Sequence, residues 1–166
     1  RRVGPGEQGQ PGVRNLPRQI ERDLRARADE MVARSLAEGD PFFYGSFMHM
    51  WRRLAADFPV EVVPGVTGFS GCSARAGAPL TWGDDVLTVL PGTLDEATLL
   101  RRLAETDAAV IMKIGRNMAK VRRAITVANL IDRAIYVERG SMPGERIAPL
   151  AEVMDDSAPY FSMILI

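Results

Sequence analysis

The sequence has 166 residues, of which 46% are hydrophobic and 25% are charged. Lysine plus arginine and aspartate plus glutamate balance at 21 each, so the formal net charge at pH 7 is zero. This balance gives no electrostatic argument for nucleic acid or an anionic membrane as a partner. The length and composition suit one ordinary globular domain or two small lobes.

The residues that report on the cellular compartment indicate a cytoplasmic protein. No apolar run is long enough to span a bilayer, and the polar N-terminus, rich in Gly and Arg, lacks the pattern of a signal peptide. The single cysteine, Cys72, excludes an internal disulfide and suits a reducing compartment. One cysteine and one histidine, His49, are too few ligands for a structural zinc site, so we expect no metal.

The first half of the chain combines glycine-bearing loops with helices. Residues 1–14 carry glycines and prolines that argue against a helix or a central strand. Hydrophobic periodicity and breaker residues then predict, in chain order, an amphipathic helix at 15–36, a helix at 47–58, a strand at 60–63 and a helix of small residues at 70–76. The first of these helices runs into the loop at 38–46 with no strand between them. We therefore expect the N-terminal lobe to be incomplete.

The second half of the chain alternates strands with helices. Apolar runs predict strands at 85–90, 108–113, 134–138, 147–150 and 160–166. A helix that Thr93 caps follows the first of these strands, and a helix at 118–128 follows the second. This alternation predicts an α/β fold with mostly parallel sheets. A loop-like stretch at 77–83 places the lobe boundary there, which gives an N-terminal lobe of residues 1–78 and a C-terminal lobe of residues 79–166.

Glycine-bearing loops lie at the ends of several predicted strands. They are residues 39–40, 67–68, 114–115 and 140–141. Glycine lets the backbone approach a ligand closely, and ligands of open α/β sheets bind beyond the carboxyl ends of the strands. These loops therefore predict a ligand cleft. Their spacing matches neither the G-x-G-x-x-G fingerprint nor the P-loop.

Five stretches are more specific than the loops alone. They are residues 38–48 (EGDPFFYGSFM), 63–67 (VPGVT), 109–116 (AVIMKIGR), 136–140 (YVERG) and 159–163 (PYFSM). In this order they resemble the tetrapyrrole methylase family over residues 37–166, and the first and last stretches point to the branch that methylates precorrin-2 at C20. The resemblance implies a two-lobed α/β fold with S-adenosylmethionine bound between the lobes, and a homodimer.

The resemblance also implies roles for individual residues. By matching positions, the contacts of S-adenosylmethionine would be Glu38, Gly39, Asp40, Phe43, Thr67, Gly68, Met112 and Gly140. Arg116 would bind the tetrapyrrole, because a guanidinium pairs bidentately with the carboxylates of such a substrate. No catalytic base is assigned. In an arbitrary protein, Asp40 would be a turn residue, Thr67 a helix cap and Met112 a core residue.

The implied reaction is methyl transfer from S-adenosylmethionine to C20 of precorrin-2, a step of corrin biosynthesis. Because a sulfonium loses its positive charge in the transition state, a dry site that does not stabilise the cation favours this step. Two alternatives stay open. One is methylation at another ring position or of a cobalt-containing intermediate, and the other is a non-catalytic remnant that binds ligands without turnover.

Overall fold

The computed structural model describes Arg22, Ala37 and residues 39–166. The predicted irregular segment at 1–14, nearly all of the predicted helix at 15–36, and the candidate contact Glu38 lie outside the described residues. The chain divides into two compact units, Arg1–Val66 and Thr67–Ile166. This division falls earlier than residue 78, so the helix predicted at 70–76 belongs to the second unit.

In the first unit, helix α2 (Phe47–Leu54) follows the loop at 39–46. The helix forms as predicted but ends four residues earlier, in a turn where the Phe58 N–H donates to the Leu54 carbonyl at 2.9 Å. The ring of Phe42 packs edge-on against Trp51 of α2, with 5.3 Å between the ring centroids. Aromatic packing thus attaches the loop to the helix.

The strand predicted at 60–63 is wrong, because this segment makes no strand pairing. Its β-branched residues favour an extended backbone, but a strand also needs a neighbour for its backbone hydrogen bonds. Among the described residues of the first unit, there is no strand that supplies one. Val60 and Val63 accordingly remain exposed, at 38% and 73%.

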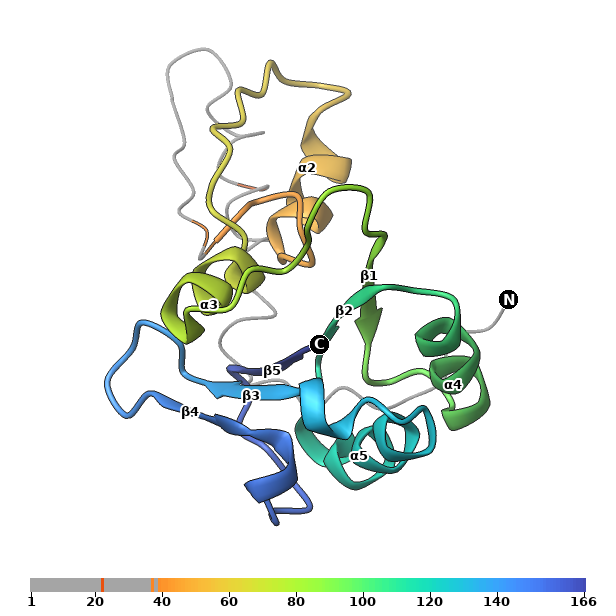
Figure 1. Ribbon diagram of the computed structural model, residues 1–166. Helices are drawn as coiled ribbons and strands as arrows, with labels where there is room; N and C mark the ends of the chain where they lie inside the picture. The colour runs from red at the N-terminus through yellow and green to blue at the C-terminus, as the bar shows by residue number, and fades with distance from the viewer. Residues whose placement is uncertain (1–21, 23–36, 38) are drawn as a thin grey trace. The chain divides into compact units, whose positions relative to one another are not determined.

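The second unit is a mixed α/β structure built on one sheet (Figure 1). Its strands are β1 (Leu87–Pro91), β2 (Ala108–Met112), β3 (Ile135–Glu138), β4 (Arg146–Pro149) and β5 (Ser162–Leu165). Its α-helices are α3 (Gly68–Ala76), α4 (Glu96–Ala104) and α5 (Met118–Val127), and its short 3-10 helices are η1 (Gly115–Asn117), η2 (Ile131–Arg133) and η3 (Leu150–Glu152). No helix in the described part of the chain has the length and apolar character that crossing a bilayer requires.

The expectation of mostly parallel pairing is wrong. The strand order is β1-β2-β5-β3-β4, and only the β1–β2 pair is parallel. The three other pairs, β2–β5, β5–β3 and β3–β4, are antiparallel. A parallel pair needs a crossover such as α4, whereas β3 and β4 are joined by a short loop and β5 inserts between β2 and β3. The five strand positions were predicted to within about two residues.

The helix after β1 begins two residues later than Thr93 would allow. Asp95 is the N-cap, and its carboxylate accepts a hydrogen bond from the Thr98 N–H at 2.8 Å. A second bond, from the Thr98 hydroxyl at 2.9 Å, holds the same carboxylate. Asp95 therefore satisfies a backbone donor of the first turn, and the predicted Thr93 cap is wrong.

Both faces of the sheet are covered, which explains the continuous apolar runs of its strands. Successive residues point to opposite faces. Ile111, Tyr136 and Ile164 pack with α4 and α5 in one cluster. Val110, Val137 and Met163 pack with α3 in the other. We call this second cluster, formed by Cys72, Val110, Val137, Met163 and Leu165 with Phe69 and Met112 at its margin, the α3 cluster.

Candidate functional site

The carboxyl ends of three strands meet at one edge of the sheet in the second unit. β1 and β2 are parallel, and β5 is antiparallel to both β2 and β3, so β1, β2 and β3 run in the same direction. The loops after these strands begin at Gly92, Lys113 and Arg139. We call this side of the sheet the carboxyl edge. It is where ligands of open α/β sheets bind.

Met112 ends β2 at this edge, half-buried at the margin of the α3 cluster. Its carbonyl accepts a hydrogen bond from the Gly92 N–H at 2.6 Å. Glycine suits position 92, because an added Cβ would lie in tight contact, 3.2 Å from the Ile114 Cα and from the Met112 carbonyl oxygen. The β1 and β2 ends are thus joined through backbone atoms.

Thr67 and Gly68 begin α3, two residues earlier than predicted. Thr67 occupies the N-cap position, but its side chain makes no capping hydrogen bond to the helix backbone. Its hydroxyl lies 2.8 Å from the Ser70 hydroxyl instead. The first turn of α3 therefore lacks the usual side-chain acceptor for its N–H groups.

Gly68 and Gly140 both border the α3 cluster. A Cβ on Gly68 would lie 3.7 Å from the Met163 Cε, and one on Gly140 would lie 2.7 Å from the Cys72 Sγ. Burial, and then the nearby Glu145 carboxylate, raises the pKa of the Cys72 thiol above its ordinary value. Gly68, Met112 and Gly140, far apart in the sequence, thus surround one neutral apolar cluster.

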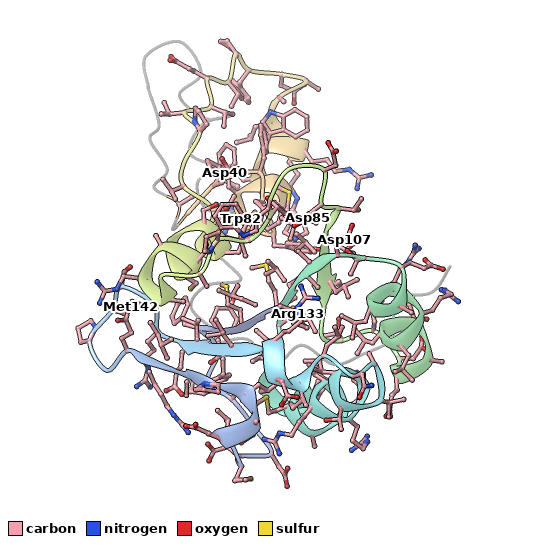
Figure 2. The ribbon with its side chains drawn as sticks, in the orientation of Figure 1. Asp40, Trp82, Asp85, Asp107, Arg133 and Met142 are labelled. Atoms are coloured by element: carbon pink, nitrogen blue, oxygen red, sulfur yellow. The ribbon has the colours of Figure 1, made fainter. Side chains whose placement is uncertain are left out.

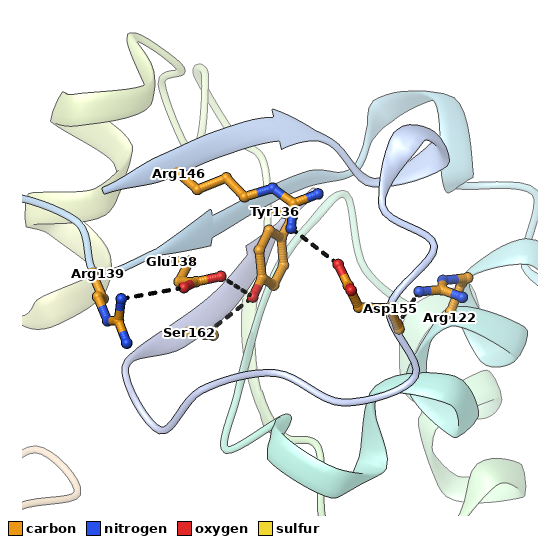
Figure 3. A network of polar contacts seen from close by, with 7 residues as sticks. All are labelled: Arg122, Tyr136, Glu138, Arg139, Arg146, Asp155 and Ser162. Carbon is orange, nitrogen blue, oxygen red and sulfur yellow. Dashed lines mark hydrogen bonds and ion pairs between the residues drawn. The ribbon is translucent and has the colours of Figure 1, made fainter. Parts of the chain in front are cut away.

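A polar network holds the strands beside this edge together (Figure 3). The Tyr136 hydroxyl lies 3.0 Å from the Glu138 carboxylate, to which it donates, and 3.3 Å from the Ser162 hydroxyl. Burial raises the pKa of Tyr136 above its ordinary value. The Arg146 guanidinium lies over the Tyr136 ring, 5.7 Å from its centroid, and pairs with Asp155 at 3.0 Å. Sequence reasoning missed this network, although Tyr136 and Glu138 lie two residues apart on one strand face.

The described candidate contacts of the first unit, Gly39, Asp40 and Phe43, lie in one loop, which Asp40 joins to a second loop. Its carboxylate accepts hydrogen bonds from the Phe42 N–H at 2.9 Å and from the Gly65 N–H at 3.0 Å. An added Cβ on Gly65 would overlap the Gly39 carbonyl oxygen. Within this unit, the loops at 39–46 and 63–66 therefore touch. The Asp40 bond to Phe42 also has the geometry of a turn residue, the ordinary role weighed for it above.

The last two candidates to be located are Phe43 and Arg116. Phe43 packs edge-on against Tyr44, with 5.1 Å between the ring centroids. Arg116 is exposed on η1, directly after β2. A hollow on the α4–α5 side of the sheet is lined by other residues, Glu96, Ala119, Arg122, Arg123, Thr126, Val127 and Asp156. It contains none of the predicted contacts.

The sequence as a whole identifies the family. The profile of the Tetrapyrrole (Corrin/Porphyrin) Methylases matches residues 6–153, so the chain belongs to this family. Residues of the chain are 60% identical over 131 positions to a precorrin-2 C(20)-methyltransferase of Sinorhizobium sp., covering 79% of this chain and 54% of that protein. They are 50% identical over 131 positions to the cobalamin biosynthesis protein CobIJ of Mycobacterium bovis, covering 79% of this chain and 26% of that protein. The chain thus spans about half the length of the first relative and about a quarter of the second.

A third relative and two solved structures complete the comparison. A cobalt-precorrin-2 C(20)-methyltransferase of Salmonella typhimurium is 33% identical over 130 positions, with 77% of this chain and 55% of that protein covered. The fold is that of the cobalt precorrin-4 methyltransferase CbiF, with a TM-score of 0.70 at 22% identity over 95% of this chain and 72% of that one. The structure of uroporphyrin-III C-methyl transferase from Thermus thermophilus, solved with S-adenosylhomocysteine, matches with a TM-score of 0.65 at 27% identity. The match covers 92% of this chain and 72% of that one.

Proposed function

We propose that the protein transfers the methyl group of S-adenosylmethionine to C20 of precorrin-2, and that it acts in the cytoplasm as a homodimer. Its 60% identity to the precorrin-2 C(20)-methyltransferase of Sinorhizobium sp. supports this choice within the family. The structural observation that carries the proposal is the gathering of Gly68, Met112 and Gly140 around the α3 cluster. These three residues were selected as cofactor contacts from the sequence alone.

The residues around the α3 cluster suit a methyl donor. When bound, S-adenosylmethionine supplies an activated methyl group on a sulfonium. The α3 cluster contains no charged side chain, and the raised pKa of Cys72 keeps its thiol neutral at neutral pH. Apolar surroundings of this kind exclude water, which favours a step in which positive charge is lost.

Polar groups for the rest of the donor come from the loops. The first-turn N–H groups of α3, beside Thr67 and Gly68, are suited to donate hydrogen bonds to a polar end of the molecule. Gly39, Asp40 and Phe43 of the first unit remain proposed contacts of the donor. Arg116, exposed after β2, remains the proposed partner of a substrate carboxylate. The role of this chain's residues is to bind and align the two reactants.

A cobalt-containing substrate is the second candidate. The similarity to the cobalt-precorrin-2 C(20)-methyltransferase of Salmonella typhimurium supports it. That identity is 33%, however, whereas the identity to the precorrin-2 C(20)-methyltransferase of Sinorhizobium sp. is 60%. The metal-free substrate is therefore our first choice. Comparing kcat/KM on precorrin-2 and cobalt-precorrin-2 distinguishes the two, and a higher value on the cobalt compound would reverse the order.

The decisive test is calorimetric titration with S-adenosylhomocysteine, followed by a methyl-transfer assay with S-adenosylmethionine and precorrin-2. We expect both binding and turnover. The absence of binding would contradict the proposed function. Binding without turnover on either tetrapyrrole would instead identify a non-catalytic ligand-binding protein.

Asp40→Ala tests the first-unit contacts. We expect the Kd for S-adenosylhomocysteine to rise about tenfold, because the change removes the acceptor that joins the two loops. Asp85→Ala is the matched control, since Asp85 also accepts a backbone N–H, that of Trp82 at 2.9 Å, in a turn of the second unit (Figure 2). Equal affinity in the two variants would remove Asp40 from the proposed site.

A further inference from the structure

The loop between β3 and β4, residues 139–145, packs on one face of α3. Gly68, Cys72 and Arg75 are spaced by four and three residues, so they lie along the same face of this helix. Gly68 faces Met163, and Cys72 contacts Gly140 at the start of the loop. The last of the three, Arg75, reaches the end of the loop.

Arg75 holds this loop through a bidentate ion pair with Glu145. Its Nε lies 2.9 Å from Glu145 Oε2, and its Nη2 lies 2.6 Å from Oε1. The same carboxylate accepts the Ser141 N–H at 2.6 Å, so it also fixes the backbone of the loop. The Glu145 side chain is 19% exposed and that of Arg75 is 55% exposed. Two parallel N–H···O bonds fix direction as well as distance, which a single-point contact cannot do.

The backbone of the loop needs such a constraint. Arg139 and Ser141 have φ of 49° and 64°, a backbone conformation that residues other than glycine rarely adopt. The start of the loop is held next to β5, because the Arg139 N–H donates to the carbonyl of Phe161, the residue before this strand, at 2.7 Å. Its other end is held to α3 by Arg75. The ion pair therefore keeps Gly140 beside Cys72 while the first turn of α3 keeps Thr67 and Gly68 on the same side of the sheet.

We propose that Arg75 and Glu145 are positioning residues of the methyl-donor site, which hold the Gly140 loop in its binding-competent conformation against α3. This inference rests on the proposed function. Without the ion pair, the loop would populate other conformations, and binding would require it to be ordered first. The measured affinity is then reduced in proportion to the fraction of molecules whose loop is in the binding-competent conformation. Neither residue needs to touch the donor or the substrate.

Arg75→Ala tests this role by calorimetric titration with S-adenosylhomocysteine. We expect the Kd to rise about fivefold, and Arg75→Lys, which keeps the charge but not the bidentate geometry, to restore part of the loss. Arg123→Ala is the matched control. It removes another exposed ion pair, with Glu96 at 3.0 Å, on the α4–α5 side of the sheet, and should leave the Kd unchanged.

A second measurement reports on the loop itself. Tryptic cleavage after Arg139, followed by mass spectrometry, should be about fivefold faster in Arg75→Ala than in the wild type and in Arg123→Ala. S-adenosylhomocysteine should slow this cleavage. Thermal melting checks that all variants remain folded under the conditions of the titration.

The outcomes separate the two proposals. If the wild type does not bind S-adenosylhomocysteine, the proposed function fails and this inference fails with it. If the wild type binds and Arg75→Ala binds equally well, only the positioning role is overturned. Equal losses of affinity in Arg75→Ala and Arg123→Ala would also overturn it, because the effect would then be general and not specific to the loop.

Discussion

The two edges of the sheet in the second unit are completed in different ways. Before β1 and β2, on the side of the sheet that we call the amino edge, side chains satisfy the backbone (Figure 2): Asp107 accepts the Val86 N–H at 3.0 Å, and Arg133 donates to the Asp107 carbonyl at 2.9 Å. At the carboxyl edge, glycine residues also bring the backbone into close contact, in addition to the Ser141 N–H that the Glu145 carboxylate accepts. The Gly92 N–H donates to the Met112 carbonyl, and Gly140 lies directly against Cys72.

From this difference we expect the amino edge to serve stability and the carboxyl edge to serve binding. Polar side chains fill the amino edge and leave its backbone groups paired, which is a stabilising arrangement. At the carboxyl edge, the absence of Cβ atoms lets loops approach the sheet and each other, and backbone can face a ligand. Changes at the carboxyl edge should therefore alter ligand affinity, while changes at the amino edge should alter stability alone.

Gly140→Ala is expected to have the largest effect. The new Cβ would lie 2.7 Å from the Cys72 Sγ and 3.3 Å from the Val137 Cγ1, so the loop or α3 must move. Overpacking of this kind lowers the free energy of unfolding by about 1–3 kcal/mol, which chemical denaturation measures. A variant as stable as the wild type would contradict the close approach of the loop to α3.

The double variant Gly140→Ala/Cys72→Ala distinguishes two reasons for a glycine at position 140, packing against Cys72 and binding of the donor. Removing the sulfur makes room for the new methyl group, so part of the lost stability should return. If the affinity for S-adenosylhomocysteine stays low in the double variant, Gly140 is needed by the donor as well. If affinity returns with stability, the glycine is required only by Cys72, and its place among the proposed contacts is lost.

Asp107→Ala should have an intermediate effect that is confined to stability. It leaves the Val86 N–H without its acceptor at 3.0 Å, at a cost of about 1 kcal/mol in the free energy of unfolding. The Kd for S-adenosylhomocysteine should not change. A marked loss of affinity, measured in the same titration, would show that the two edges are not functionally separate.

The smallest effect is a pH dependence at the carboxyl edge. The hydrogen bonds from Arg75, and then from Ser141, lower the pKa of Glu145 from 4.5 to about 2. Because the folded pKa is the lower one, the contribution to stability is fully present above about pH 4.5 and is lost as the pH falls toward 2. Carbon NMR titration of the Glu145 carboxyl should give the low midpoint in the wild type and a higher one in Arg75→Ala. Equal midpoints would show that the ion pair does not persist in solution.

Local patterns were enough to predict most elements of the second unit. The apolar run at 108–113 predicted β2, because a strand buried on both faces has no polar alternation. The pairing of that strand could not be predicted, since β5, which pairs antiparallel with it, comes more than 50 residues later. The segment at 60–63 failed for the complementary reason: its β-branched residues fit a strand, but no described strand of its unit pairs with them.

The candidate site shows the same limit. The loop residues could be selected by resemblance, because their short motifs are contiguous in the sequence. The contact between Gly140 and Cys72 and the ion pair between Arg75 and Glu145 join residues about 70 positions apart. Neither residue of the ion pair has a local signal that distinguishes it from a solvated charge. Only the fold brings them together.

The order of strands in the sheet has a consequence for folding. β5 lies between β2 and β3, where Leu165 pairs with Val110 on one side and with Ile135 on the other, yet it follows β1 to β4 in the sequence. Until β5 pairs with them, the β1–β2 and β3–β4 pairs are separate ribbons, each with an apolar edge that awaits a partner. Pairing of β5 with both ribbons joins them into one sheet, and until then these edges are open to a chaperone or to misassociation.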